Sequence, residues 1–267
     1  NDHIDGARGS DTYHFALGDG ADILYDYDST AYYGSGTDTD TLVFGTGIVA
    51  GDLNVTQDSE GDLIIAIEGT DDSVTISQFF NNAGYQIEGV EFSDGTELSA
   101  AQLAALAMQG SSSNDYLRGT KNADTITGLA GDDRIYGMNG DDDLTGGTGN
   151  DRINGSRGSD TYHFALGDGA DTLYDYDSTA YGSGTGTDTD ILVFGTGIVA
   201  GDLNVTQDSD GSLIIAIEGT DDSVTINQFF SNAAYQIESV EFSDGTALSA
   251  AQLAALAMQG SSSNDYL

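Results

Sequence analysis

Six aspartates in the middle of the chain are spaced nine residues apart, and this spacing is the strongest constraint on the fold. They are Asp115, Asp124, Asp133, Asp142, Asp151 and Asp160. Two positions after each of them comes an apolar or aromatic residue, at Leu117, Ile126, Ile135, Leu144, Ile153 and Tyr162. Four positions after each of the first five comes a glycine, at Gly119, Gly128, Gly137, Gly146 and Gly155. Three series in phase indicate a repeated structural unit, because disordered acidic linkers lack periodic apolar positions.

Each residue type in the nine-residue unit has a physical role, which is clearest in the segment 146–154, Gly-Gly-Thr-Gly-Asn-Asp-Arg-Ile-Asn. Glycines at the first, second and fourth positions are expected to adopt positive φ, so that the chain turns sharply and points its carbonyl groups inward. The aspartate adds a carboxylate to these carbonyls, and an all-oxygen shell is what Ca²⁺ prefers. The three residues after the turn are expected to form a short strand whose middle aliphatic side chain points inward.

This segment fits the pattern GGxGxDxUx and resembles the nonapeptide of the repeats-in-toxin (RTX) calcium-binding proteins. The resemblance implies a right-handed parallel β-roll in which two nonapeptides form one turn, so that loops two repeats apart stack and share metal ions. It pairs Asp115 with Asp133, Asp124 with Asp142, Asp133 with Asp151, and Asp142 with Asp160. The loops of the middle pairs carry glycine at the fourth position, at Gly131, Gly140, Gly149 and Gly158, and we expect these four residues to belong to the calcium sites.

A longer repeat of about 150 residues is superimposed on the nonapeptides. Segment 10–20 recurs as 159–169, and segment 45–58 recurs as 195–208. Correspondence between the copies and a late turn after the roll add four candidate calcium ligands, Asp2, Asp11, Asp22 and Asp171. Both ends of the sequence stop inside a nonapeptide, so we expect a slice of a longer tandem array.

Five segments are expected from the two repeats. They are the end of a truncated roll (1–15), a β-rich extension (16–109), the RTX roll (110–163), a second copy of the extension (164–259) and the start of a further roll (260–267). The expected fold class is all-β.

The extension itself contains segments typical of strands, at 203–207, 213–218, 224–230 and 235–242, and segment 188–192 is expected to add a rung to the roll. A capping box from Ser249 to Gln252 predicts a short helix that ends near Gly260. The segment Tyr-Gln-Ile-Glu-x-Val-Glu-Phe-Ser-Asp-Gly-Thr is similar to the haemolysin-type calcium-binding-related extension of large secreted bacterial proteins. The pattern leaves open whether the extension forms a separate sandwich or continues the roll.

Charge makes folding depend on cations. The chain has 45 acidic and 6 basic residues and a formal net charge of −39, and neither 9–117 nor 158–267 contains a Lys or Arg. Ion pairs cannot neutralise such stretches, and a charge of this size repels itself in a compact state. Because calcium sites do not exist in the unfolded chain, metal binding and folding are expected to be coupled. A nucleic acid partner is excluded, because it would require a basic surface, and direct insertion into a membrane is not expected.

The calcium demand predicts an extracellular location, where Ca²⁺ is millimolar and weak modular sites fill. The resemblance implies type I secretion from a Gram-negative bacterium, followed by folding on contact with calcium.

Three functions compete. The first is a calcium-rigidified structural or adhesive segment, favoured by near-identical tandem copies that stack like solenoid modules. The second is a Ca²⁺-dependent carbohydrate-binding module, a role that would suit an ancillary part of a polysaccharide-active exoenzyme. Its candidate ligand residues are Tyr25, Tyr27, Tyr174 and Tyr176, whose rings could cover the apolar face of a sugar, although alternation of Tyr with Asp is also typical of a strand with one packed face.

The third function, catalysis, is not expected. The histidines are His3, His14 and His163, and no Ser elbow, HExxH helix, phosphate loop or Cys nucleophile accompanies them.

Overall fold

The structure, a computed structural model, describes residues 1–27, 39–176, 188–231 and 235–259. It divides into two compact units, Asn1–Met108 and Gln109–Leu267. The predicted further roll at 260–267 and the helix end at Gly260 lie outside the described residues.

In the second unit, the strands follow the nonapeptides and alternate between two parallel sheets. One sheet contains β10 (Tyr116–Arg118), β12 (Arg134–Asn139), β14 (Arg152–Arg157) and β16 (Ala170–Asp175). The other contains β11 (Thr125–Ala130), β13 (Asp143–Thr148), β15 (Thr161–Phe164) and β17 (Ile191–Phe194). Neighbouring strands of one sheet are two nonapeptides apart, so that Ile135 lies beside Ile153 and Ile126 beside Leu144. Two nonapeptides therefore make one turn, as the resemblance implied.

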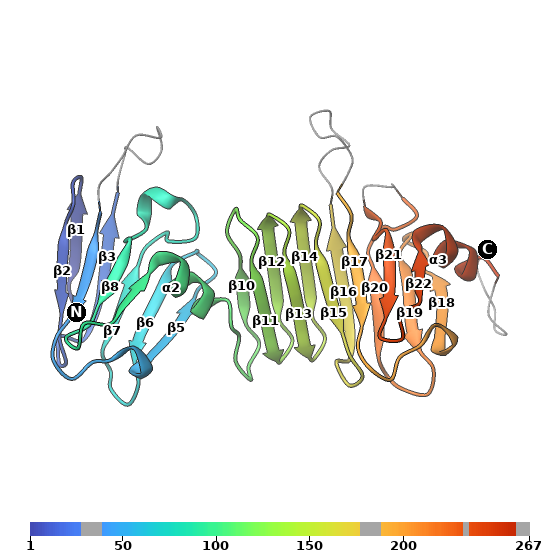
Figure 1. The fold of residues 1–267 in the computed structure, drawn as a ribbon, viewed down its shortest axis with the longest axis horizontal. Helices are drawn as coiled ribbons and strands as arrows, with labels where there is room; N and C mark the ends of the chain where they lie inside the picture. The colour runs from blue at the N-terminus through green and yellow to red at the C-terminus, as the bar shows by residue number, and fades with distance from the viewer. Residues whose placement is uncertain (28–38, 177–187, 232–234, 260–267) are drawn as a thin grey trace. The chain divides into compact units, whose positions relative to one another are not determined.

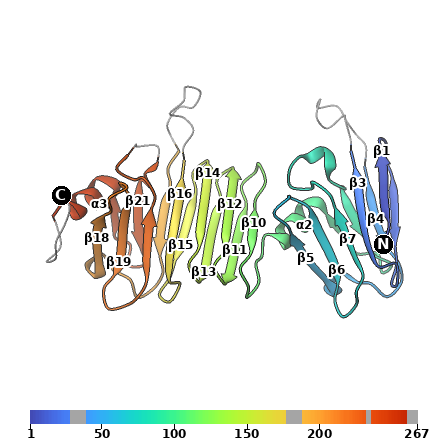
Figure 2. The same ribbon diagram turned by 180° about the vertical axis from the view of Figure 1, so that it is seen from behind.

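The extension continues the roll and does not form a separate sandwich (Figures 1 and 2). β20 (Ser223–Ile226) pairs in parallel with β16, and β21 (Ser239–Phe242) pairs in parallel with β17. Antiparallel strands then complete each sheet, namely β19 (Leu213–Ile217) and β18 (Leu203–Gln207) on one and β22 (Ala247–Ser249) on the other. The predicted strand 224–230 was too long, because Gln228 has φ +55° and belongs to a turn.

The apolar core of this unit lies between the two sheets. Side chains from β11, β12 and β13, namely Ile126, Ile135 and Leu144, are all 0% exposed. Alternate residues of the same strands are more exposed, as the pleat of a strand requires. Each further turn of the roll adds a layer of apolar side chains to this core, and burial of apolar surface stabilises a fold by about 25 cal/mol per Å². This stabilisation explains why the inward position of every nonapeptide is a large apolar or aromatic residue.

The first unit repeats the extension architecture. Its sheets run β1-β3-β7-β6-β5 and β2-β4-β8-β9. The elements are β1 (His3–Ala7), β2 (Thr12–Phe15), β3 (Ala21–Asp26), β4 (Thr41–Phe44), η1 (Ala50–Asp52), β5 (Leu53–Gln57), β6 (Leu63–Ile67), β7 (Ser73–Ile76), η2 (Ala83–Tyr85), β8 (Gly89–Glu91) and β9 (Glu97–Ser99). The second unit has the equivalent of η1 at η4 (Ala200–Asp202).

A helix of eight residues closes each extension, α2 (Ala100–Ala107) in the first unit and α3 (Ala250–Ala257) in the second. The predicted capping box is present, since the Ser249 hydroxyl accepts a hydrogen bond from the backbone N–H of Gln252. Leu253 is 0% exposed and fixes the apolar face of α3 against the extension. Neither helix has the length needed to cross a lipid bilayer, and the rest of the described chain contains no membrane-spanning helix.

Candidate metal centre

The aspartates of the nonapeptides form two ladders, one along each edge of the roll. Each carboxylate stands just before a strand, and from Asp133 onward its Oδ1 accepts the backbone N–H of the aspartate 18 residues earlier, which forms the preceding rung. These hydrogen bonds run from Asp115 N to Asp133 (2.7 Å), from Asp124 N to Asp142 (2.9 Å), from Asp133 N to Asp151 (2.8 Å) and from Asp142 N to Asp160 (2.9 Å). The structure thus brings together all four aspartate pairs expected from the resemblance.

Both ladders continue into the extension, although the spacing there is no longer nine residues. Asp171 accepts the N–H of Asp151 at 2.9 Å, and Asp190 accepts the N–H of Asp160 at 2.8 Å. The expected extra rung at 188–192 is therefore present. In the first unit, Asp22 accepts the N–H of Asp2 at 2.8 Å in the same way.

The second carboxylate oxygen, Oδ2, has different surroundings in the middle rungs than in the first two. Oδ2 of Asp133, Asp142, Asp151 and Asp160 is buried and has no hydrogen-bond partner, and these side chains are at most 2% exposed. By contrast, Oδ2 of Asp115 accepts the N–H of Ser111 at 2.6 Å, and Oδ2 of Asp124 accepts that of Thr120 at 2.6 Å. A buried carboxylate oxygen without a donor is strongly unfavourable. The middle rungs therefore have free anionic oxygens that a cation would satisfy.

The glycine at the first position of the nonapeptide is there for space and not for backbone conformation. Positive φ was expected at this position, but none of the five glycines adopts it. Instead, a Cβ at Gly128 would overlap both Oδ2 of Asp133 and the carbonyl oxygen of Gly146, and Gly137 meets Asp142 in the same way. The missing side chain lets a carboxylate and a carbonyl oxygen approach the same point, which fits the all-oxygen shell of Ca²⁺.

Positive φ is instead found at the second and fourth positions. The fourth-position glycines Gly131, Gly140, Gly149 and Gly158 have φ between +117° and +147°. The second position keeps positive φ even where it is not glycine, with +75° at Leu129 and +86° at Met138. Such a conformation costs a residue with a side chain about 1–2 kcal/mol, so the roll imposes this turn against local preference.

Burial makes the metal-free ladders sensitive to protons. Desolvation raises the pKa of Asp133 and Asp151 to about 6, that of Asp160 to about 7, and those of Asp142 and Asp171 to about 8, and neighbouring carboxylates add to the effect. The same backbone N–H groups that the ladder uses lower these pKa values, but by less than burial raises them.

The metal-free protein is therefore expected to be more stable at pH 4 than at pH 8. A carboxyl whose pKa is higher in the folded state stabilises the fold fully below its unfolded pKa of about 4, and the contribution is lost as the pH rises through 6 to 8. One pKa unit corresponds to about 1.4 kcal/mol, so several such groups together determine how the free energy of unfolding changes with pH. Circular dichroism of metal-free protein across this range would test it, with Asp94→Asn as the control. A stability of the metal-free protein that does not change between pH 4 and pH 8 would contradict this prediction.

Several residues of the extension belong to the same network but are not evident from the sequence. Asp222 accepts the N–H groups of Gly167 and Gly169 at 2.9 and 3.2 Å, and Asp72 has this position in the first unit. Asp175 and Asp190 lie close to Asp160. The extension does not keep the nine-residue spacing. Among these residues, the sequence pattern therefore indicated only the Asp-Thr-Asp segment at 188–190.

The candidate ligand tyrosines lie apart from the ladders. Tyr25 and Tyr27 contact the ring of Tyr85, with centroids 5.5 and 5.1 Å apart, and Tyr176 contacts Tyr235 at 5.2 Å. Tyr174 points outward from β16 and is 36% exposed. A sugar-binding role for these four residues remains a prediction.

Comparison with known proteins identifies the segments that carry this geometry. Residues 109–144 and 136–173 match the RTX calcium-binding nonapeptide repeat, and residues 62–102 and 213–252 match the haemolysin-type calcium binding protein related domain. The iron-regulated protein FrpA of Neisseria meningitidis serogroup C is 37% identical over 112 residues, which are 40% of this chain and 9% of that protein. The chain thus spans less than a tenth of the length of that relative.

Two solved structures are similar to this chain at lower sequence identity than FrpA. The AlgE6R3 subunit of the Azotobacter vinelandii mannuronan C5-epimerase is 29% identical at a TM-score of 0.34, over 48% of this chain and 76% of that one. The extracellular lipase LipA of Serratia marcescens is 19% identical at a TM-score of 0.31, over 84% of this chain and 35% of that one.

The matched nonapeptides are those whose aspartates form the ladders, and repeats of this type bind several Ca²⁺ ions. The chain is therefore an RTX calcium-binding repeat protein with two haemolysin-type calcium-binding-related segments, each of which contributes strands to the end of a roll.

Proposed function

We propose that this chain is a calcium-dependent structural repeat, a stiff and adhesive segment of a protein secreted to the cell surface or beyond. The observation that carries the proposal is the row of buried carboxylates with unpartnered Oδ2 atoms, from Asp133 to Asp160. The proposed ions would be held by these aspartates, by Asp171 and, in the first unit, by Asp2, Asp11 and Asp22, with carbonyl oxygens from the loops of Gly131, Gly140, Gly149 and Gly158.

The architecture supports a mechanical role. Each sheet of the second unit grows by adding one strand per turn, and the extension adds strands to the same two sheets. Such stacked modules need no distant contacts and can be joined in series. The second copy of the extension within the chain favours further copies of the repeat as neighbours in the parent protein.

The proposed location is extracellular, in a Gram-negative bacterium that uses type I secretion. Cytosolic calcium is too scarce for weak modular sites, whereas extracellular calcium is millimolar. The chain would leave the cell unfolded, because −39 charges oppose compaction, and would fold where calcium is available.

Small-angle scattering of the intact chain tests the mechanical role. Millimolar calcium should change an expanded, flexible polymer into a particle with a fixed cross-section, and the radius of gyration should fall. Magnesium at equal concentration is the control, because Mg²⁺ demands a smaller octahedral shell. A scattering curve that is the same with and without calcium would refute the proposal.

A second candidate function is calcium-dependent binding of an acidic polysaccharide, and one surface favours it. The outer face of the sheet β10-β12-β14-β16 has two rows of side chains in register. They are Tyr116, Arg134, Arg152 and Thr172 in one row, and Arg118, Tyr136, Asn154 and Tyr174 in the other. Neither row contains a carboxylate, in a protein with 45 acidic residues.

The two central arginines of this face are suited to a carboxylate ligand. Arg134 and Arg152 are exposed and adjacent on neighbouring strands, and no ion pair involves either among the described residues. With Tyr136, Asn154 and Tyr174 they line an open groove. Guanidinium groups bind carboxylates in bidentate fashion, and tyrosine rings cover sugar faces. Repulsion from the rest of the protein is screened over about 8 Å at physiological salt.

Binding of a short galacturonate oligomer in calcium buffer tests this candidate. The Arg134→Gln/Arg152→Gln variant should bind at least tenfold more weakly, because a charged hydrogen bond contributes about 1.5–3 kcal/mol. Arg8→Gln/Arg157→Gln is the matched control, with the same charge change outside both rows. Equal binding of the oligomer by the two variants would reject this site. A neutral glucan serves as the control ligand, because it measures binding that does not depend on charge.

A non-catalytic role is proposed for the chain itself, including in the case that it is an ancillary part of a polysaccharide-active exoenzyme. His163 lies on the outer face of β15, where its Nε2 is 3.1 Å from Oδ1 of Asp143. Both side chains are substantially exposed, at 37% and 54%, which is typical of a surface pair.

A further inference from the structure

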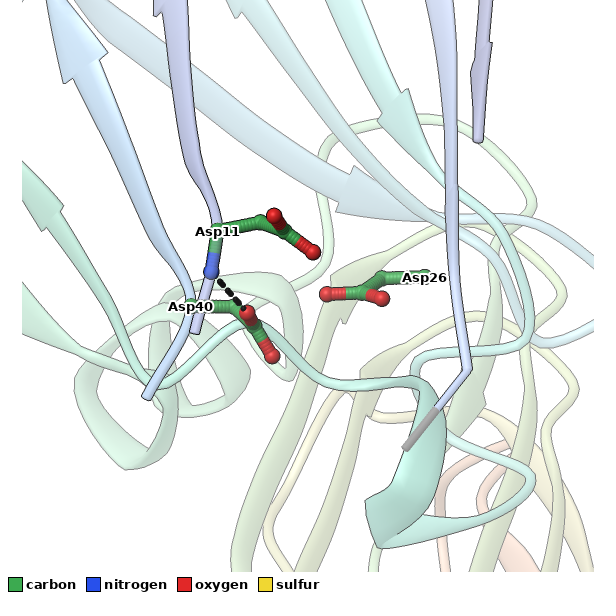
Figure 3. A group of neighbouring side chains, drawn as sticks. All are labelled: Asp11, Asp26 and Asp40. Atoms are coloured by element: carbon green, nitrogen blue, oxygen red, sulfur yellow. Dashed lines mark hydrogen bonds between the residues drawn. The ribbon is translucent and has the colours of Figure 1, made fainter. Parts of the chain in front are cut away.

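Three buried aspartates meet at the point where the roll passes into the extension. Asp160 and Asp190 precede β15 and β17 of one sheet, whereas Asp175 ends β16 of the opposite sheet. One carboxylate oxygen of each lies within 4.8 Å of the others, and the three side chains are at most 2% exposed. The first unit repeats the cluster with Asp11, Asp26 and Asp40, whose side chains point toward one another (Figure 3).

Both clusters contain buried carboxylate oxygens without a hydrogen-bond partner. Oδ2 of Asp160 and Oδ2 of Asp175 are buried without a hydrogen-bond partner, and so are Oδ2 of Asp11 and Oδ2 of Asp26. The Oδ1 atoms are differently placed, since Oδ1 of Asp175 accepts a hydrogen bond from the hydroxyl of Tyr162 at 3.2 Å. A buried carboxylate oxygen without a hydrogen-bond partner destabilises a fold by more than a typical hydrogen bond stabilises it. Such oxygens occur in both clusters.

Basic residues are absent from the sequence segments that supply these carboxylates. The sequence has no Lys or Arg from 158 to 267 or from 9 to 117, and these ranges include every member of the two clusters. Three carboxylates brought together from two sheets would repel one another strongly in a buried site. A bound cation, or protons shared within the cluster, would compensate this repulsion.

The cluster differs from the nonapeptide loops in how its ligands are supplied. In the loops, successive aspartates of one sheet edge stack on each other, as Asp133 does on Asp115. Asp175 instead follows a strand, belongs to no nonapeptide, and reaches the other two carboxylates from the opposite sheet. Tyr162 takes the inward position that is aliphatic in the preceding repeats, and its hydroxyl accepts the N–H of Gly155 at 3.0 Å beside the cluster.

We propose that Asp160, Asp175 and Asp190 bind one divalent cation, and that Asp11, Asp26 and Asp40 bind another. Calcium is the expected ion, since the donors are all oxygen. This inference rests on the proposed calcium-dependent function, and it adds a site that ties the two sheets together where the nonapeptide phase ends. Within each unit, an ion held from both sheets would then join the roll strands to the extension that follows them.

Counting the bound calcium ions of the intact chain by equilibrium dialysis and native mass spectrometry tests the proposal. The Asp26→Asn/Asp175→Asn variant should bind two fewer ions than the parent, one for each cluster, while the loop ions remain. Asp94→Asn/Asp244→Asn is the matched control, because both aspartates are exposed turn residues and the charge change is the same. An unchanged ion count in the Asp26/Asp175 variant would overturn the proposal and favour shared protons.

A measurement on the unaltered chain covers the case in which the variant does not fold. Crystals grown with calcium and soaked in a lanthanide should show an anomalous peak between Asp160, Asp175 and Asp190. Peaks in the loops with none at this position would overturn the inference and leave the proposed function standing. Failure of the parent to bind any calcium would instead refute the proposed function itself.

Discussion

Removal of calcium at pH 7 is expected to unfold the protein. Without the ions, the ladders place carboxylates that are ionised at this pH, such as Asp133 and Asp151, on adjacent rungs, with Oδ2 atoms that have no hydrogen-bond partner. An uncompensated buried charge costs several kcal/mol, and a domain has only about 5–15 kcal/mol of stability in total. A few such charges are therefore enough to reverse the sign of the folding free energy.

Far-UV circular dichroism in EGTA, compared with millimolar calcium, measures this effect. One site filled at a hundred times its dissociation constant contributes about 2.7 kcal/mol, and several sites in series should make the transition steep in calcium concentration. Sodium chloride at equal ionic strength is the control, because it screens surface charge without entering the sites. An identical β-sheet spectrum and melting temperature after thorough chelation would contradict the central role given to the ion.

The roll could be predicted from the sequence because its contacts are periodic. An aspartate and an inward apolar residue at fixed spacing determine both the loop and the strand, so the pairing of Asp133 with Asp151 follows once two repeats make a turn. The parallel register of the first strands required only the resemblance and the count of residues. The helix of each extension was equally accessible, because a capping box is a local signal.

The extension was less predictable, because its partners are separated by segments of unequal length. Asp190 continues a ladder 30 residues after Asp160, and Asp175 reaches the same place from another sheet. No local pattern shows that these side chains meet. The row of Arg134 and Arg152 was also hidden, because it exists only once strands two repeats apart become neighbours.

The reason for the first glycine of each nonapeptide was predicted wrongly, and this has a physical explanation. Glycine is selected both where φ is positive and where a Cβ has no room, and the sequence does not distinguish the two causes. Gly167 belongs to the first class, with φ +92° and no atom within 4 Å of an added Cβ, whereas Gly137 belongs to the second.

The two classes predict different results for alanine substitutions, and Gly137→Ala is expected to be among the most damaging in the roll. Its Cβ would overlap Oδ2 of Asp142 and lie 3.0 Å from the carbonyl oxygen of Gly155. Accommodating it requires movement of the carboxylate that is proposed to hold calcium. Overpacking of this kind typically costs about 1–3 kcal/mol, and loss of an ion adds the binding free energy of that site.

Gly201→Ala is the matched control for Gly137→Ala. Gly201 lies in η4, has no atom within 4 Å of the added methyl group, and does not have positive φ. Alanine there should be neutral or stabilise the fold by up to about 1 kcal/mol, because it reduces the freedom of the unfolded chain. Calcium titrations followed by melting temperature should therefore separate the variants, with Gly137→Ala needing more calcium to reach a lower plateau. If both variants titrate like the parent, Oδ2 of Asp142 is not a ligand, and the free oxygens of the ladder must be satisfied in another way.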